Sequence, residues 1–154
     1  MPFGFPVSLD VTGRRCVVFG TGAIARSRAG ALLDAGALVT VIGRPHEEGD
    51  LAGAFLAVAA TGDAAENIRI HAEAEREGVL LNAVDDPARC HFAVPSVLRR
   101  GDLVVTVATG GRAPAYARRL REELAGVVGP EHGTLVDLIG AVRAELRVER
   151  DGAG

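Results

Sequence analysis

Short apolar runs alternate with longer helix-forming stretches along most of the chain. The runs are rich in Val, Leu, Ile and Phe and stop at glycine or polar residues, as the buried strands of a sheet do. We predict strands over residues 14–19, 38–42, 54–60, 79–81 and 102–108, and a further short strand over 91–94. We predict helices over residues 23–35, 63–77, 113–127 and 131–147. Because strand and helix alternate, and right-handed crossovers join parallel strands, the pattern predicts an α/β fold with a parallel sheet.

Individual residues indicate where the first two helices begin, end and face the sheet. In the first helix, Ile24, Leu32 and Leu33 are available for a buried face, and Gly36 is placed to end it. Asp63 is placed to cap the second helix, because its short carboxylate can accept hydrogen bonds from the first free backbone amides.

The last predicted helix carries an apolar stripe at helical spacing, formed by Leu135, Leu138, Ile139, Val142 and Leu146. Little chain is left to cover these side chains, so we favour a helical subunit interface, with packing on the domain's own sheet as the alternative. The chain is then expected to consist of a sheet domain over residues 1–112 and a helical region over 113–154 that serves dimerisation and the substrate side.

The composition is that of a soluble globular protein with one hydrophobic core. The 154 residues are 48% hydrophobic and 24% charged. No apolar stretch reaches the roughly 20 residues of a membrane-spanning helix, and the first residues lack a basic signal-peptide start, so we expect a cytoplasmic protein without a membrane partner. The net charge of −3 argues against nucleic acid. Two cysteines, Cys16 and Cys90, are too few for a disulfide framework or a zinc site, and no metal ligands are predicted.

A glycine-rich turn follows the first predicted strand and opens the first helix. The segment 20–25, Gly-Thr-Gly-Ala-Ile-Ala, fits the dinucleotide-binding fingerprint in that context. Gly20 permits the tight turn, Gly22 lets a pyrophosphate approach the backbone amides at the positive end of the helix, and Ala25 allows close contact between helix and strand. The pattern favours a Rossmann-type, nucleotide-binding domain, with a merely structural glycine turn as the alternative.

The choice between NAD and NADP stays open at the end of the second predicted strand. An acidic residue usually binds the adenosine ribose there, but Gly43, Arg44 and Pro45 occupy the position in this chain. Arg44 could pair with the 2′-phosphate of NADP, or it could be an ordinary solvated loop arginine.

Asp85 follows the strand predicted over residues 79–81 and is the candidate for acid–base chemistry. The sequence Asn82-Ala83-Val84-Asp85 places this carboxylate near the carboxyl edge of the sheet, where open α/β folds bind their ligands. It could accept a proton during hydride transfer, although Asp85-Asp86-Pro87 is also a good turn sequence.

A second glycine turn, Thr109–Pro114, lies between the last predicted strand and a helix. Its amides at Gly110 and Gly111 could bind a carboxylate, and Arg112 and Arg118 could add forked donors. An ordinary loop is the alternative interpretation.

Taken in order, these segments resemble the N-terminal module of sirohaem synthases and the stand-alone precorrin-2 dehydrogenases. The resemblance runs from Phe5 to about Leu124. It rests on the segments 5–9, 13–14, 20–25, 59–67, 82–86, 92–96 and 109–118. Several motifs in register are far more specific than any one of them.

This resemblance implies oxidation of precorrin-2 to sirohydrochlorin with NAD, or alternatively NADP, by a homodimer; some family members also insert ferrous iron. It implies that Asp85 is the general base. The implied cofactor contacts are Gly20, Gly22, Ala23, Ile24, Arg44, Pro45 and Thr61. The implied contacts to precorrin-2 or a related tetrapyrrole are Asn82, Gly110, Gly111, Arg112 and Arg118.

The chain departs from the family pattern between Pro45 and Asp50. This stretch is much shorter in the chain than in the family, and a whole strand is missing. Loss of that strand would leave a sheet edge that needs cover beside the adenosine site. A diverged family member that acts on another substrate, or a non-catalytic module that binds a nucleotide or tetrapyrrole, therefore stays as an alternative function.

Overall fold

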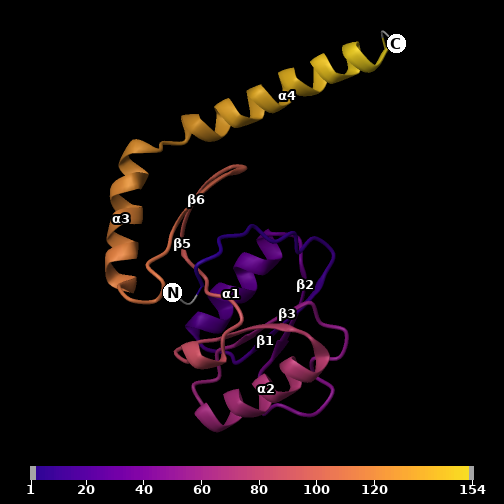
Figure 1. The fold of residues 1–154 in the computed structure, drawn as a ribbon, viewed down its shortest axis with the longest axis vertical. Helices are drawn as coiled ribbons and strands as arrows, with labels where there is room; N and C mark the ends of the chain where they lie inside the picture. Colours follow the sequence, from indigo (N-terminus) through magenta and orange to yellow (C-terminus); the bar gives the residue numbers. More distant parts are fainter. Residues whose placement is uncertain (1–2, 153–154) are drawn as a thin grey trace. The chain divides into compact units, whose positions relative to one another are not determined.

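The computed structural model describes residues 3–152 (Figure 1). The chain forms two compact units, Met1–Val94 and Pro95–Gly154. The first unit contains a parallel sheet with its helices, and the second contains an antiparallel hairpin and two helices. Within the described residues, no helix is long and apolar enough to cross a membrane.

The first unit is built on a four-stranded sheet in the order β2-β1-β3-β4, with every neighbouring pair parallel. The strands are β1 (Arg15–Phe19), β2 (Leu38–Ile42), β3 (Leu56–Ala59) and β4 (Leu80–Ala83). The helices are α1 (Ala23–Asp34) and α2 (Ala64–Glu77), and a short 3₁₀ turn, η1, covers Pro87–Arg89. The predicted α/β fold with a parallel sheet is therefore confirmed.

The two helices cover opposite faces of this sheet (Figure 1). Along β1, Cys16 and Val18 pack in one core cluster with α1, whereas Val17 and Phe19 pack in the other with α2. Successive side chains of a strand point to opposite faces, so a strand covered on both sides must be apolar throughout. That is why β1 and β3 read as unbroken apolar runs.

The buried face of α1 differs from the prediction. Ile24 and Leu33 were expected in the core but are 48% and 57% exposed, and Ala25 and Ala29 are buried instead. Leu32 is partly buried against the same cluster. Small side chains let the helix backbone approach the sheet closely, so the helix rotates its alanines inward and its larger side chains outward.

The predicted loss of a strand is visible as an exposed edge at β2. Among residues 3–152 this strand pairs only with β1, and its Leu38 and Val41 are 63% and 51% exposed. The short segment from Gly43 to Leu51 follows it and returns the chain to β3 without adding a strand.

The second unit begins with a hairpin that the sequence only half predicts. Strands β5 (Ser96–Arg100) and β6 (Leu103–Val107) pair antiparallel around Gly101 and Asp102. The predicted strand over 102–108 is confirmed as β6, but the strand predicted over 91–94 is wrong, because those residues are bends and irregular chain. Because β6 pairs with β5 and not with the parallel sheet, the compact units divide after Val94, whereas the expected domain division lies at residue 112.

Two helices, α3 (Pro114–Val127) and α4 (Glu131–Gly152), complete the second unit. The predicted ranges end close to the observed ones for α3 and five residues early for α4, at 147 against 152. The apolar stripe of α4 is uncovered, with exposed fractions of 52% to 60% at Leu135, Leu138, Ile139, Val142 and Leu146.

Candidate functional site

A cavity of about 530 Å³ lies at the carboxyl edge of the parallel sheet, within the first unit. Three loops line it, and they follow β1, β3 and β4. The chain leaves β1 toward β2 on one side, while β3 pairs on the other side of β1, so this is the point at which the strand order reverses. Open α/β sheets bind their ligands at such a point. The lining residues are Gly22, Ala23, Ile24, Ala60, Thr61, Gly62, Ala64, Asn67, Val84, Asp85 and Asp86.

The glycine-rich turn has two glycines with different physical roles. Gly20 has a φ of +106°, and a Cβ on it would lie 2.3 Å from the carbonyl oxygen of Ala60, so only glycine fits between β1 and the loop after β3. Gly22 has an ordinary φ of −69°, and a Cβ on it would meet no atom within 4 Å. Its missing side chain therefore leaves open space beside the cavity instead of relieving strain.

The start of α1 offers free backbone donors to this cavity. Gly22 is the N-cap, no side chain caps the helix, and the first turn holds no acidic residue. Ala23 and Ile24 line the cavity. The first amides of a helix have no partner inside the helix and carry a partial positive charge, which suits a phosphate group. These residues fit the pyrophosphate of a dinucleotide.

Thr61 also lines the cavity, and the start of α2 fixes its side chain. Its hydroxyl accepts a hydrogen bond from the Asp63 amide at 3.0 Å and donates to the Asn67 side chain at 3.1 Å. Asp63 caps the helix, as predicted, by accepting from the amides of Ala65 and Glu66. The predicted cofactor contact Thr61 therefore has a set position at the cavity wall.

Asp85 projects from a tight turn at the end of β4. The Asp86 amide donates to the Ala83 carbonyl at 3.2 Å, and Asp85 has a φ of +62°, which is uncommon for a residue other than glycine. Asp86 is paired with Arg89 at 2.5 Å, whereas Asp85 is exposed and lines the cavity. The turn and the candidate site, which were alternatives for this sequence, coexist: the turn presents the carboxylate to the cavity.

Arg44 and Pro45 are not among the residues that line the cavity. The Arg44 guanidinium donates two hydrogen bonds to the Asp50 carboxylate and one to the Pro45 carbonyl. Hydrogen bonding from Arg44 holds the pKa of Asp50 below its usual value. The charge of Arg44 is thus compensated within the loop.

A buried polar network holds the short loop after β2 against α2, and the sequence analysis did not predict it. Glu73 is 2% exposed; one of its oxygens accepts from the amides of Gly49 and Leu51 at 2.9 and 3.1 Å, and the other contacts the His46 ring. Glu66 accepts from the His46 amide at 2.8 Å. The two glutamates share one helix face with buried Ile70. Glutamates at helix positions where apolar residues are expected are the signal that could have revealed the network, because a buried carboxylate needs hydrogen-bond partners.

Asn82 is buried and bonded to the chain that follows β4. Its amide donates to the Phe92 carbonyl at 3.0 Å and approaches the Cys90 sulfur at 3.6 Å. The Cys90 thiol also bonds to the backbone of Ala83, and burial raises its pKa. Asn82 thus orders the chain beside the cavity loop, and its predicted contact with substrate stays a prediction.

The second glycine turn belongs to the second unit. Gly110 and Gly111 have φ values of +61° and +77°, and the Ala113 amide donates to the Thr109 hydroxyl at 3.2 Å just before α3. The geometry is that of a turn that needs glycine. The substrate contacts predicted at Gly110, Gly111, Arg112 and Arg118 stay predictions.

Comparison with known proteins identifies the class to which this site belongs. Residues 7–96 match the NAD_binding_7 family, which is described as "Putative NAD(P)-binding". This segment includes the glycine-rich turn and all the residues that line the cavity. The chain belongs to this NAD(P)-binding family, and its cofactor is a nicotinamide dinucleotide.

Longer matches confirm the resemblance to sirohaem synthases. The chain is 35% identical to "Siroheme synthase" of Photobacterium profundum over 92% of its own length and 34% of that protein's length. It is 33% identical to "Siroheme synthase" of Methylococcus capsulatus, again over 92% of this chain and 34% of that protein. The chain therefore spans about a third of the length of the curated relatives it matches.

A solved structure confirms the fold. The structure titled "SirC, precorrin-2 dehydrogenase" matches 91% of this chain and 79% of its own chain, with a TM-score of 0.76 and 24% identity. The Rossmann-type fold predicted for the chain is thus shared with this solved structure.

Proposed function

We propose that this chain catalyses the NAD-dependent oxidation of precorrin-2 to sirohydrochlorin in sirohaem biosynthesis, in the cytoplasm. The observation that carries the proposal is that Asp85 shares one cavity with Gly22, Ala23 and Ile24. A base and a dinucleotide site on the same cavity are what removal of a hydride and a proton requires. The relatives named siroheme synthase support this choice of reaction.

The dinucleotide would lie along the carboxyl edge of the sheet. Gly22, Ala23 and Ile24 would bind its pyrophosphate through the start of α1, while Gly20 keeps the turn tight enough for this approach. Thr61, which also lines the cavity, would lie near the nicotinamide end. A bound dinucleotide would supply the hydride acceptor for the oxidation.

Asp85 would act as the general base. Precorrin-2 loses two electrons and two protons when it becomes sirohydrochlorin; one proton leaves with the electron pair as hydride, and the Asp85 carboxylate takes the other. Its exposed position on the cavity leaves the carboxylate accessible to a substrate. The same carboxylate could take pyrrole protons if ferrous iron is inserted into the product, and we treat that chelation as a secondary activity.

Substrate carboxylates would bind at the second glycine turn and its arginines. Gly110 and Gly111 present backbone in the conformation that glycine favours, and Arg112 and Arg118 offer forked donors to carboxylates.

NAD is the proposed cofactor in preference to NADP. The charge of Arg44 is already paired with Asp50, so no free arginine follows β2 to meet a 2′-phosphate. The Arg44–Asp50 pair closes the loop after β2, and Arg44 and Pro45 in this loop would lie beside the adenosine ribose.

The exposed stripe of α4 supports a homodimer. Its five apolar side chains repeat at helical spacing and are more than half exposed, which is unusual for a monomer. Replacing Leu138 and Val142 together by glutamate should convert a dimer to a monomer in sedimentation analysis. A wild-type chain that sediments as a monomer would contradict the proposal.

The decisive experiment is anaerobic incubation of the chain with enzymatically generated precorrin-2 and either NAD or NADP. Sirohydrochlorin and reduced cofactor should form in equal amounts, and faster with NAD. Cofactor binding without turnover would favour the second candidate, a diverged member that acts on another substrate, which the missing strand beside β2 suggests.

A further inference from the structure

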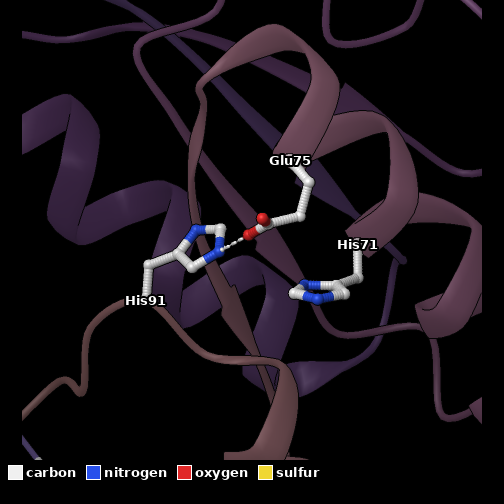
Figure 2. Close-up of side chains that lie close together, drawn as sticks. All are labelled: His71, Glu75 and His91. Atoms are coloured by element: carbon white, nitrogen blue, oxygen red, sulfur yellow. Dashed lines mark hydrogen bonds and ion pairs between the residues drawn. The ribbon is translucent and has the colours of Figure 1, made fainter.

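Two histidines and a glutamate meet on the first unit, among residues that the nucleotide cavity does not use. His71 and Glu75 lie one turn apart on α2, and His91 lies in the segment after η1 (Figure 2). Each offers one ligand atom, and these atoms all lie within 4.8 Å of one another. None of the three residues lines the cavity at the carboxyl edge.

The arrangement has the chemistry of a metal site. Residues four apart on a helix face the same side, so His71 and Glu75 can contact one ion together, and Figure 2 shows the His91 ring facing them from a different segment. Two imidazoles and one carboxylate suit first-row divalent ions such as Zn²⁺, at metal–ligand distances of about 2.0–2.2 Å. With mutual separations of up to 4.8 Å, the three side chains would have to draw closer together to hold one ion at those distances.

The backbone orients the His91 ring. Its Nδ1 accepts a hydrogen bond from the Leu81 amide at 3.0 Å and lies 3.2 Å from the Val79 carbonyl. Because the backbone offers this nitrogen both a donor and an acceptor, either tautomer is satisfied. The other nitrogen, Nε2, faces the Glu75 carboxylate at 2.5 Å. A metal-bound histidine usually donates its far N–H to a carbonyl or carboxylate, and the Val79 carbonyl can accept from Nδ1 in this way.

An ion pair between His91 and Glu75 accounts for only part of this cluster. The His71 ring lies 5.6 Å from the His91 ring, centroid to centroid, and its Nδ1 is buried without a hydrogen-bond partner among residues 3–152. A buried polar atom without a partner is costly, and it calls for an explanation. A cation held by all three side chains would engage both imidazoles as well as the carboxylate.

We propose that His71, Glu75 and His91 form a binding site for a first-row divalent metal ion, with Zn²⁺ as its representative and water completing the coordination. The ion would join α2 to the chain that leaves β4. The site is separate from the proposed dehydrogenase cavity and does not depend on that proposal.

The test is a titration of the metal-free full chain with Zn²⁺ in competition with a chromogenic chelator. We expect one ion per chain. The affinity should fall at least about tenfold in each of His71→Ala, His91→Ala and Glu75→Gln, because loss of even a residue that only hydrogen-bonds to a metal ligand reduces affinity by that much. His132→Ala is the matched control, because His132 lies on α4 in the second unit and should leave the affinity unchanged. Zn²⁺ should also raise the melting temperature of the wild type and not that of His91→Ala.

A Co²⁺ spectrum identifies the ligands independently. Nitrogen and oxygen ligands give weak visible bands without the strong thiolate absorption that Cys90 would produce. A thiolate band would overturn the proposal, and so would a wild-type affinity equal to that of the His71→Ala/His91→Ala double variant. Unchanged circular dichroism of each variant ensures that lost binding reflects lost ligands.

Discussion

The Arg44 guanidinium and the Asp50 carboxylate form a bidentate pair, with hydrogen bonds of 2.8 and 3.0 Å. The two residues lie at opposite ends of the short loop that follows the edge strand β2, where the family pattern has a longer segment. Asp50 also accepts from the Glu47 amide at 2.9 Å. The pair therefore closes the loop and at the same time compensates the arginine that could have selected NADP.

Replacing Asp50 by asparagine should move nucleotide preference toward NADP. The change keeps the size of the side chain but frees the charge of Arg44 for a 2′-phosphate. We expect the ratio of NADP to NAD affinity to rise about tenfold, the equivalent of about 1.4 kcal/mol. Fluorescence titration of both cofactors measures the ratio, and Arg44→Ala should abolish the gain in the double variant. An unchanged ratio would remove Arg44 from the adenosine site.

The same pair makes stability depend on pH in acid. The pKa of Asp50 lies below its usual value in the folded chain, mainly because Arg44 donates hydrogen bonds to its carboxylate. A depressed folded-state pKa gives stability that is complete above the unfolded value and is lost as pH falls through the folded value. In urea unfolding, the wild type should thus exceed Asp50→Asn in stability at pH 7, and the difference should shrink below about pH 4. A difference that grows in acid would contradict this account.

Glu73 should be far more important to stability than an exposed glutamate of the same helix. Glu73→Ala leaves the amides of Gly49 and Leu51 without their buried acceptor, and it leaves His46 without its partner. We expect a loss of about 2–4 kcal/mol in the free energy of unfolding, measured with urea. Glu77→Ala, at an exposed position on α2, is the control and should change stability by less than about 0.5 kcal/mol. Equal effects would mean that the network does not hold the loop.

Substitution of the two glycines of the nucleotide turn should affect different properties: stability at Gly20 and cofactor binding at Gly22. Gly20→Ala should destabilise the fold by about 2–4 kcal/mol, because its Cβ would lie 2.3 Å from the Ala60 carbonyl oxygen at a φ of +106°. Gly22→Val should fold normally, because a Cβ there meets no atom within 4 Å, but its side chain should fill the pyrophosphate site. Thermal melts and NAD titration separate the two effects. Unchanged NAD affinity in Gly22→Val would show that the pyrophosphate lies elsewhere.

Elements whose signal is local could be predicted from the sequence. The strand at residues 38–42, the cap at Asp63 and the turn at Asp85 each depend on residues adjacent in the chain, and all three are present. The strand wrongly expected at residues 91–94 has the right residue types, but its Phe92 carbonyl is bonded to the Asn82 side chain and not to a neighbouring strand.

Features that depend on contacts distant in sequence could not be predicted in the same way. Strand β5 contains Arg99 and Arg100, so it lacks an apolar run and is revealed only by its pairing with β6. In the candidate site, the wall residues Gly22 and Asp85 were predicted because each follows a strand at the same sheet edge, and Thr61 was predicted from the family resemblance. The partner of Arg44 and the buried Glu73 were missed, because they depend on how the short loop folds against α2.

The central claim is that Asp85 is the base for oxidation at the nucleotide cavity. The most direct test is the anaerobic turnover of precorrin-2 with NAD by the wild type and by Asp85→Ala, with NAD affinity measured on the same samples. The account predicts that the wild type produces sirohydrochlorin and reduced cofactor together, whereas the variant binds NAD normally and loses at least about a hundredfold in rate. A variant that turns over at the wild-type rate would contradict the account.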